Sequence, residues 1–268
     1  MVRQPAVAGQ FYPGDGKKLR MELDKYVVFA DRAEKALGII APHAGYIYSG
    51  SVAGRVYGQV SVPSCVIILG PNHHGLGARA ALYPEGEWLT PLGTARINTP
   101  LADLVSKHAS IVQEDTTAHH YEHSLEVQLP FLQYVRPDVT IVPICLGFGD
   151  YSSCVALGSG IAGAIGEYCN EVLIVASSDM THYEPHDQAS RPGVRQARRS
   201  RRGGQSGPLG NGWACGPPPP WAACSFIFFI CAATVQALAL NCAFLAWCSL
   251  SWAIASSGNE HQSLFFSM

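Results

Sequence analysis

The sequence lacks an excess of charge of either sign. Its 268 residues include 18 Lys and Arg against 20 Asp and Glu, which gives a formal net charge of −2. Proteins that bind nucleic acid or anionic membranes through charge need a basic surplus, so we expect no nucleic-acid partner. The N-terminal residues also lack the apolar core of a secretory signal. We therefore expect a cytoplasmic protein.

Paired cysteines are missing from the first 190 residues as well. The cysteines there are Cys65, Cys145, Cys154 and Cys169, and they form no CxxC pair and no disulfide-framework spacing. A zinc cluster or a disulfide scaffold would show such spacing. We interpret all of them as small buried hydrophobic residues in a reducing compartment.

Charged side chains disappear altogether from Gly203 to Asn259. The basic cluster 191–204 precedes this stretch, and the apolar run 221–255 within it is long enough to span a bilayer, with the arginines on the cytoplasmic side. The alternative is an aberrant tail, because charge-free sequence rich in Pro, Cys and Trp that begins abruptly is typical of out-of-frame translation. We favour the aberrant tail, residues 191–268, and expect membrane contact only if the run is a genuine anchor.

The tail is not expected to complete the domain formed by residues 1–190. It lacks the alternation of polar and apolar positions that an element packed on a soluble core requires. A domain without its last strands exposes an open sheet edge, which is a route to association. The full chain is therefore expected to be poorly soluble.

Residues 1–190 alternate between two kinds of apolar pattern. Strands buried on both faces are predicted at the continuous apolar runs 36–42, 65–70, 139–146 and 171–177. Helices are predicted at 16–27, 50–60, 99–108, 122–135 and 152–166, with Pro130 interrupting the fourth of these or ending it early. This alternation predicts an α/β fold with a mixed, largely parallel central sheet and helices on both faces.

Three of the predicted strands end in turns that carry imidazoles or a carboxylate. These residues are His43 after the first strand, His73 and His74 after the second, and Asp179 and His182 after the fourth. Ligands bind at the carboxyl ends of strands in such sheets, so we expect the three strands to be neighbours whose turns share one cleft. Adjacent residues of an extended chain point to opposite sides, and only one of the two neighbouring histidines is expected to face it. Because neutral imidazole is the commonest metal ligand, the pattern indicates a metal or acid–base site.

A further cluster, "HHYEHSLE", occupies residues 119–126. His123 and Glu126 are three residues apart, which places both on one face of the predicted helix. Such a pair supports a metal site or a proton relay, but acidic residues in a first turn also complement the helix dipole. Both interpretations stay open, and we place His74, His123, Glu126 and Tyr46 around the cleft.

Five segments of the chain resemble motifs of the Memo family, whose bacterial and archaeal members are called AmmeMemoRadiSam system protein B. The segments are "QPAVAGQFYP" (4–13), "IIAPHAGYIYSG" (39–50), "ILGPNHHG" (68–75), "EHSLEVQLPFLQ" (122–133) and "VASSDMTHYEP" (175–185). The resemblance covers about residues 1–190. It implies a fold similar to that of the class III extradiol (LigB-like) dioxygenases, non-haem iron enzymes that open catechol rings.

The resemblance also implies roles for individual residues. His43 and His73 would be metal ligands, together with a cysteine in a late "CG" segment for which Cys215 is the nearest candidate. Asp179 and His182 would line the site, with His182 in the place of the acid–base histidine of the dioxygenases. The sequence around Cys215 departs from the family pattern, so this chain is expected to keep two of the three ligands.

Three functions are compatible with these residues. The first is a redox metalloprotein related to dioxygenases, with one Fe(II) ion, or copper in its place, and His182 moving the proton, whereas zinc would favour the second function. The second is a metal-dependent hydrolase in which His182 or Glu126 is the base. In the third, the same cleft binds a peptide or partner protein without chemistry. The ligand is expected to be a small molecule or a peptide.

Overall fold

The computed structural model of this protein describes residues 1–179, 252–255 and 263–267. Within these ranges the strands form one 11-stranded sheet in the order β1-β5-β6-β8-β3-β9-β2-β11-β10, with β4 paired to β8 and β7 to β4. The strands are β1 (Val2–Arg3), β2 (Ala36–Ala41), β3 (Cys65–Pro71), β4 (Ala80–Leu82), β5 (Glu87–Thr90), β6 (Gly93–Ile97), β7 (Gln113–Glu114), β8 (Thr140–Leu146), β9 (Leu173–Ser177), β10 (Trp252–Ala255) and β11 (Ser263–Ser267). The helices are α1 (Gly16–Tyr26), α2 (Tyr46–Gln59), α3 (Thr99–His108), α4 (Leu129–Val135) and α5 (Tyr151–Tyr168), with short 3-10 turns η1 (Thr117–His119) and η2 (Glu126–Gln128).

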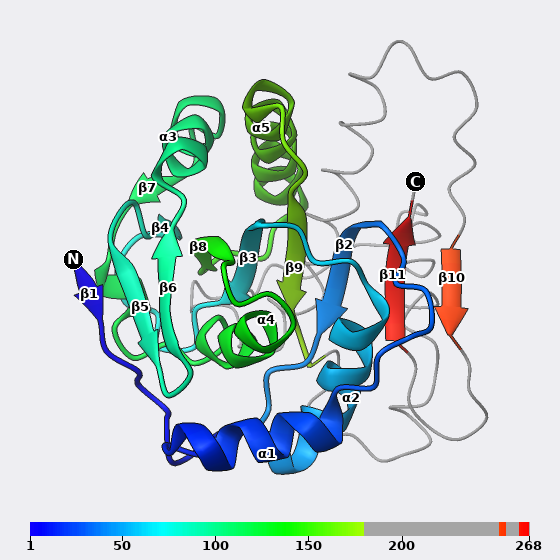
Figure 1. Ribbon diagram of the computed structural model, residues 1–268. Coiled ribbons are helices and arrows are strands. Elements are labelled where there is room, and N and C mark those ends of the chain that lie inside the picture. The colour runs from blue at the N-terminus through cyan, green and yellow to red at the C-terminus, as the bar shows by residue number, and fades with distance from the viewer. Residues whose placement is uncertain (180–251, 256–262, 268) are drawn as a thin grey trace, which may run out of the picture.

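The centre of the sheet is parallel, in the order β8-β3-β9-β2 (Figure 1). Ile67 of β3 lies opposite Val142 of β8 on one side and Ile174 of β9 on the other, and Ile39 of β2 lies opposite Val175 of β9. Every residue of β3 and β9 is buried, as expected for strands whose sequence is apolar without alternation. The α/β fold, the mixed, mostly parallel sheet and the adjacency of the three turn-bearing strands are thereby confirmed.

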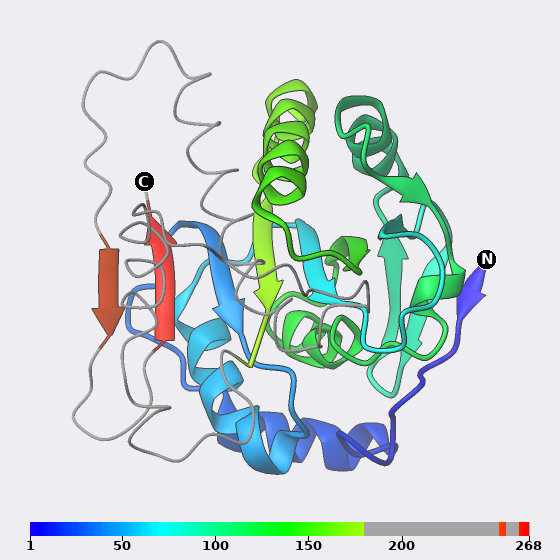
Figure 2. The same ribbon diagram turned by 180° about the vertical axis from the view of Figure 1, so that it is seen from behind.

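The helices form two groups. Helix α1 packs on α2 and α4, and α3 packs along α5; Figures 1 and 2 show the first group below the sheet centre and the second above it. Gly54 allows α2 to approach the end of α1 closely, because a Cβ atom at that position would lie 2.4 Å from the carbonyl carbon and oxygen of Tyr26.

One predicted helix, over residues 122–135, is wrong in its extent. The regular helix α4 begins only at Leu129 and follows the 3-10 turn η2. Pro130 lies in the first turn of α4. Backbone N–H groups in a first turn have no acceptor within the helix, so a proline costs no hydrogen bond there, and its fixed φ suits the helix. The proline therefore starts the helix instead of interrupting or ending it.

The interpretation of the early cysteines as buried residues needs one correction. Cys65, Cys145 and Cys154 are buried free thiols, but Cys169 is exposed. It caps the end of α5 in a left-handed conformation with φ 58°, and this conformation occurs where a helix ends at the surface.

The expectation of an open sheet edge, left by missing last strands, is corrected at β2. Strand β11 pairs antiparallel with β2, with Phe265 opposite Ile39, and β10 pairs with β11. The division of the chain near residue 190 stays a prediction, and most of the apolar run 221–255 lies outside the described residues. Among the helices of the described ranges, none has both the length and the apolar character needed to cross a membrane.

Candidate metal centre

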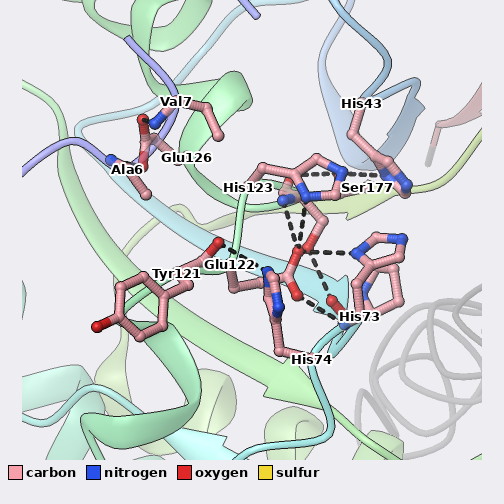
Figure 3. Close-up of polar contacts among 12 residues, drawn as sticks. Ala6, Val7, His43, His73, His74, Tyr121, Glu122, His123, Glu126 and Ser177 are labelled. Atoms are coloured by element: carbon pink, nitrogen blue, oxygen red, sulfur yellow. Dashed lines mark hydrogen bonds and ion pairs between the residues drawn. The ribbon is translucent and has the colours of Figure 1, made fainter. Parts of the chain in front are cut away.

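Three histidines from three separate loops meet at the carboxyl ends of the central strands. His43 follows β2, His73 follows β3, and His123 lies between η1 and η2. One ring nitrogen from each lies within 4.8 Å of those of the other two. The ring centroids are 5.3 Å apart for His43 and His73, 5.7 Å for His43 and His123, and 4.4 Å for His73 and His123 (Figure 3).

The ring of His43 is held by Ser177, the last residue of β9. The Nδ1 atom of His43 lies 3.0 Å from the Ser177 hydroxyl. That hydroxyl donates to the carbonyl of Ser124 at 2.6 Å and accepts from the side-chain amide of Gln128 at 2.8 Å. A hydroxyl has one proton to donate, so the proton between the ring and Ser177 belongs to Nδ1. The lone pair of His43 is consequently on Nε2.

Asp179 fixes the turn that carries His43. One of its carboxylate oxygens accepts the backbone N–H groups of His43 at 2.6 Å and Ala44 at 3.1 Å, and the other lies 3.7 Å from Nε2 of His43. Burial lowers the pKa of His43 to about 4, although the Asp179 charge opposes this shift. His43 is therefore neutral at neutral pH, and a carboxylate oxygen of Asp179 lies near its Nε2 atom.

A single buried carboxylate, Glu122, contacts the other two rings. Its Oε1 atom accepts from Nδ1 of His73 at 2.8 Å and lies 3.4 Å from Nδ1 of His123. Burial opposes ionisation of Glu122, but its partners outweigh that effect, chiefly His73 and then the backbone N–H of Ser124, and lower its pKa to about 2. Burial also lowers the pKa of His123. Glu122 was not among the predicted site residues, because it lies in an irregular loop whose path the sequence pattern does not indicate.

The structure brings Glu126 to the N-terminal segment rather than to the histidines (Figure 3). Its carboxylate accepts from the guanidinium of Arg3 at 2.7 Å, the Tyr12 hydroxyl at 2.6 Å, and the backbone N–H groups of Ala6 and Val7 at 2.7 and 3.0 Å. All of these groups are donors to a fully buried carboxylate. Glu126 consequently anchors the start of the chain.

The anchored segment reaches the site through Phe11. Its ring centroid lies 4.7 Å from that of His123, and its carbonyl accepts the backbone N–H of Tyr46 at 2.8 Å. The hydroxyl of Tyr46 donates to the carbonyl of Val127 at 2.7 Å. Tyr46 therefore joins the elements that carry the site, and Phe11 supplies an apolar surface beside it.

The remaining predicted residues lie elsewhere or outside the described ranges. His74 is exposed, and its Nε2 atom lies 3.1 Å from the carbonyl of Tyr121, so the structure does not bring it to the other rings. His182 and Cys215 lie outside the described residues.

The donor set fits a transition-metal ion. Imidazole nitrogen suits zinc, copper, iron and nickel. Ligand histidines in metal sites commonly bond their second ring nitrogen to a carboxylate or another acceptor, and here His73 has Glu122 and His43 has Ser177 in that position. Sequence reasoning grouped His123 with the cleft rather than with the ligands, because its approach depends on the loop before η2.

Comparisons with known proteins agree with the motifs. A family model described as Memo-like protein matches residues 3–202. A MEMO1 family protein of Pyrobaculum arsenaticum is 45% identical over 198 residues, which is 69% of this chain and 70% of the relative. One from Thermococcus onnurineus is 45% identical over 197 residues, 69% and 67% of the two chains, and one from Methanosarcina acetivorans is 45% identical over 190 residues, 70% of each.

Proposed function

Because this chain belongs to the Memo family, we propose that it is a metal-binding protein whose ion is held by His43, His73 and His123. The observation that carries the proposal is the approach of one nitrogen from each ring to within 4.8 Å of the others. The hydrogen bonds of the Nδ1 atoms support it, since they leave the Nε2 atoms of His43 and His73 as ligands.

The ion would supply Lewis-acid polarisation of a bound ligand and, if it is iron or copper, electron transfer. The residues of the chain hold the geometry. Asp179 fixes the His43 turn and directs its second oxygen to within 3.7 Å of Nε2, where it can orient a ligand or hold a proton. Phe11 places an apolar ring against His123.

A redox role with Fe(II), or with copper, is the first form of this function. The resemblance of the family to non-haem iron dioxygenases supports it, and so does the carboxylate of Asp179 beside the histidines. Within this proposal His182 is the acid–base residue, Cys215 is a further candidate ligand, and the substrate is a small molecule or a peptide.

A hydrolytic role is the second form, and one observation favours it. Three imidazoles with no thiolate among the described residues of the cluster are one ligand set of catalytic zinc sites, in which the metal activates a bound water. Asp179 would then be the base, because its carboxylate is nearest to the ligand nitrogen of His43.

Metal analysis of the full chain tests the proposal. We expect one ion per chain after purification without oxygen, measured by plasma mass spectrometry, and loss of that ion in His43→Ala. Iron or copper would support the redox role, and zinc the hydrolytic one. A wild-type chain that holds no metal and takes up neither Zn²⁺ nor Fe²⁺ on titration would contradict both.

A further inference from the structure

Glu122 lies in the same loop as His123, its fully buried side chain contacts His73, and it thereby joins the two loops that carry these histidines. We propose that Glu122 is a positioning residue, which fixes one tautomer of both rings and so presents them together to a single divalent cation. This inference rests on the proposed function and names the residue that organises the site.

The tautomer follows from the partners of the carboxylate. An ionised carboxylate only accepts hydrogen bonds, so the nitrogen facing it must carry the proton. For His73 this nitrogen is Nδ1, which donates to Oε1 at 2.8 Å. Nδ1 of His123 lies 3.4 Å from the same oxygen as an ion-pair contact, and the carboxylate charge favours the proton on that nitrogen. The two rings stack with an interplanar angle of 25°. Both lone pairs are thereby left on Nε2.

The carboxylate cannot turn away from the rings. Its Oε2 atom accepts the backbone N–H of His73 at 2.6 Å, and Oε1 accepts that of Ser124 at 2.8 Å. Arg3 donates to the backbone carbonyl of Glu122 at 2.8 Å, and the Ser124 hydroxyl donates to the carbonyl of Pro71 at 2.9 Å. The loop after β3 and the loop before η2 are therefore tied together at Glu122.

The charge of Glu122 has a chemical consequence as well. A carboxylate bonded to a ligand imidazole raises its basicity and its donation to the metal. His43 has a neutral partner, Ser177, in the corresponding place. Glu122 therefore strengthens two of the three ligands and offsets part of the charge of a divalent cation.

Glu122→Gln separates this role from simple packing. Each partner of the carboxylate is an N–H donor, so the amide of glutamine must turn its own NH₂ toward one of them. In the place of Oε1 it faces Nδ1 of His73, and the ring can pair with it only by moving its proton to Nε2, which removes the ligand lone pair. In the place of Oε2 it faces the backbone N–H of His73 and disturbs the turn that carries the ring. Loss of such a partner typically weakens metal binding about 10- to 100-fold.

The matched control is Asp115→Asn. Asp115 also joins two loops through backbone N–H groups, those of Ala78 at 2.6 Å and Thr117 at 2.7 Å. It makes none of the hydrogen bonds to the rings that Glu122 makes. The control therefore reports the effect of weakening a comparable loop contact.

The experiment uses the full chain, stripped of metal, with ¹⁵N-labelled histidine. At pH 8 we expect NMR to show the Nδ1–H tautomer for His73 and His123 in the wild type and in Asp115→Asn, and a population of the Nε2–H tautomer for at least one of them in Glu122→Gln. Calorimetric titration with Zn²⁺ should give a Kd about 10- to 100-fold higher for Glu122→Gln alone.

The outcomes distinguish the two proposals. Wild-type tautomers together with wild-type Zn²⁺ affinity in Glu122→Gln would overturn the role of Glu122. A wild-type chain that binds no Zn²⁺, while Glu122→Gln still changes the tautomers, would overturn the proposed function and uphold the tautomer assignment. If Glu122→Gln does not fold, the wild type alone decides: Nδ1–H for both rings supports the proposal, and Nε2–H for either ring overturns it.

Discussion

The hydroxyl of Ser177 gives its proton to the carbonyl of Ser124 and can only accept from the ring of His43. The two hydrogen bonds are 2.6 and 3.0 Å long. Gln128 donates to the same hydroxyl. A hydroxyl can donate one hydrogen bond and accept two, so the Ser177 hydroxyl has no further hydrogen bond to make. The orientation of the most buried ring in the candidate site is thus determined by the last residue of a neighbouring strand.

Ser177→Ala is expected to weaken metal binding and to lower stability. Without the hydroxyl, His43 loses the acceptor that fixes its tautomer, and Zn²⁺ affinity should fall about tenfold. The buried amide of Gln128 also loses a partner, which costs about 1–3 kcal/mol in the free energy of unfolding. Calorimetry and urea denaturation measure these effects. The control is Thr90→Val, which removes a buried hydroxyl hydrogen-bonded to Gln133; it should lower stability but keep the Zn²⁺ affinity. Equal Zn²⁺ affinities for the wild type and Ser177→Ala would refute the prediction.

Glu126→Gln is expected to destabilise the protein strongly. Arg3 and Glu126 form a buried ion pair at 2.7 Å, and removing one charge leaves the other uncompensated, at a cost of about 3–5 kcal/mol. Urea denaturation of the two proteins gives the difference. The control Glu171→Gln breaks an exposed ion pair with Lys35 and should leave the midpoint of urea denaturation unchanged. A similar response of both variants would show that burial is not the cause.

Two glycine substitutions in helices should have opposite effects. Gly54→Ala places a methyl group 2.4 Å from the backbone of Tyr26, so α1 and α2 must separate and the protein should lose stability by about 1–3 kcal/mol. Gly166→Ala in α5 meets nothing within 4 Å and should gain up to about 1 kcal/mol from helix propensity. Thermal denaturation followed by circular dichroism measures both. A shift in the same direction would contradict the close packing of α1 on α2.

Stability should fall as the pH drops below about 6.5, partly because of His119. Its ring is buried and donates from Nε2 to the carbonyl of Ala81 at 3.0 Å. Burial lowers its pKa to about 4, whereas the ordinary value is about 6.5. Between these values the unfolded chain binds the proton and the folded chain does not. The stabilisation is therefore complete above the higher pKa and is lost on acidification toward the lower one.

The size of this effect is roughly 2 kcal/mol at pH 5 for one such histidine. His119→Gln keeps a donor for Ala81 and removes the titration, so its free energy of unfolding should change less between pH 8 and pH 5 than that of the wild type. The pKa of His43 is lowered in the same way, so the variant should keep the part of the pH dependence that comes from His43. Parallel pH profiles of the two proteins would contradict the assignment.

The centre of the sheet was predictable because its chemistry is uniform. Strands buried on both faces need continuous apolar sequence, and β2, β3, β8 and β9 lie where such runs occur. The peripheral strands β4 to β7 are short, and β5 alternates in burial. Short strands of this kind have no distinctive pattern, so they were not predicted.

The candidate site was predictable only where its residues directly follow strands. His43, His73 and Asp179 do so, and strand order alone brings their turns to one edge. His123 and Glu122 lie in a loop whose path depends on tertiary contacts, above all on the hydrogen bonds of Glu122 to His73. The assumed helical spacing from His123 selected Glu126 instead. That spacing does not apply, because the turn η2 begins only at Glu126 and His123 lies in the loop before it.

Strand β9 lies between β2 and β3, although it follows both in the chain. During synthesis on the ribosome, the facing edges of β2 and β3 therefore lack their partner until residues 173–177 have been made. At about 5–20 residues per second, the interval from the end of β3 is roughly 5–20 s. The nascent chain exposes two apolar strand edges throughout this time, and the turns of His43 and His73 cannot meet before it ends. Chaperone binding to the growing chain should accordingly be greatest in this window.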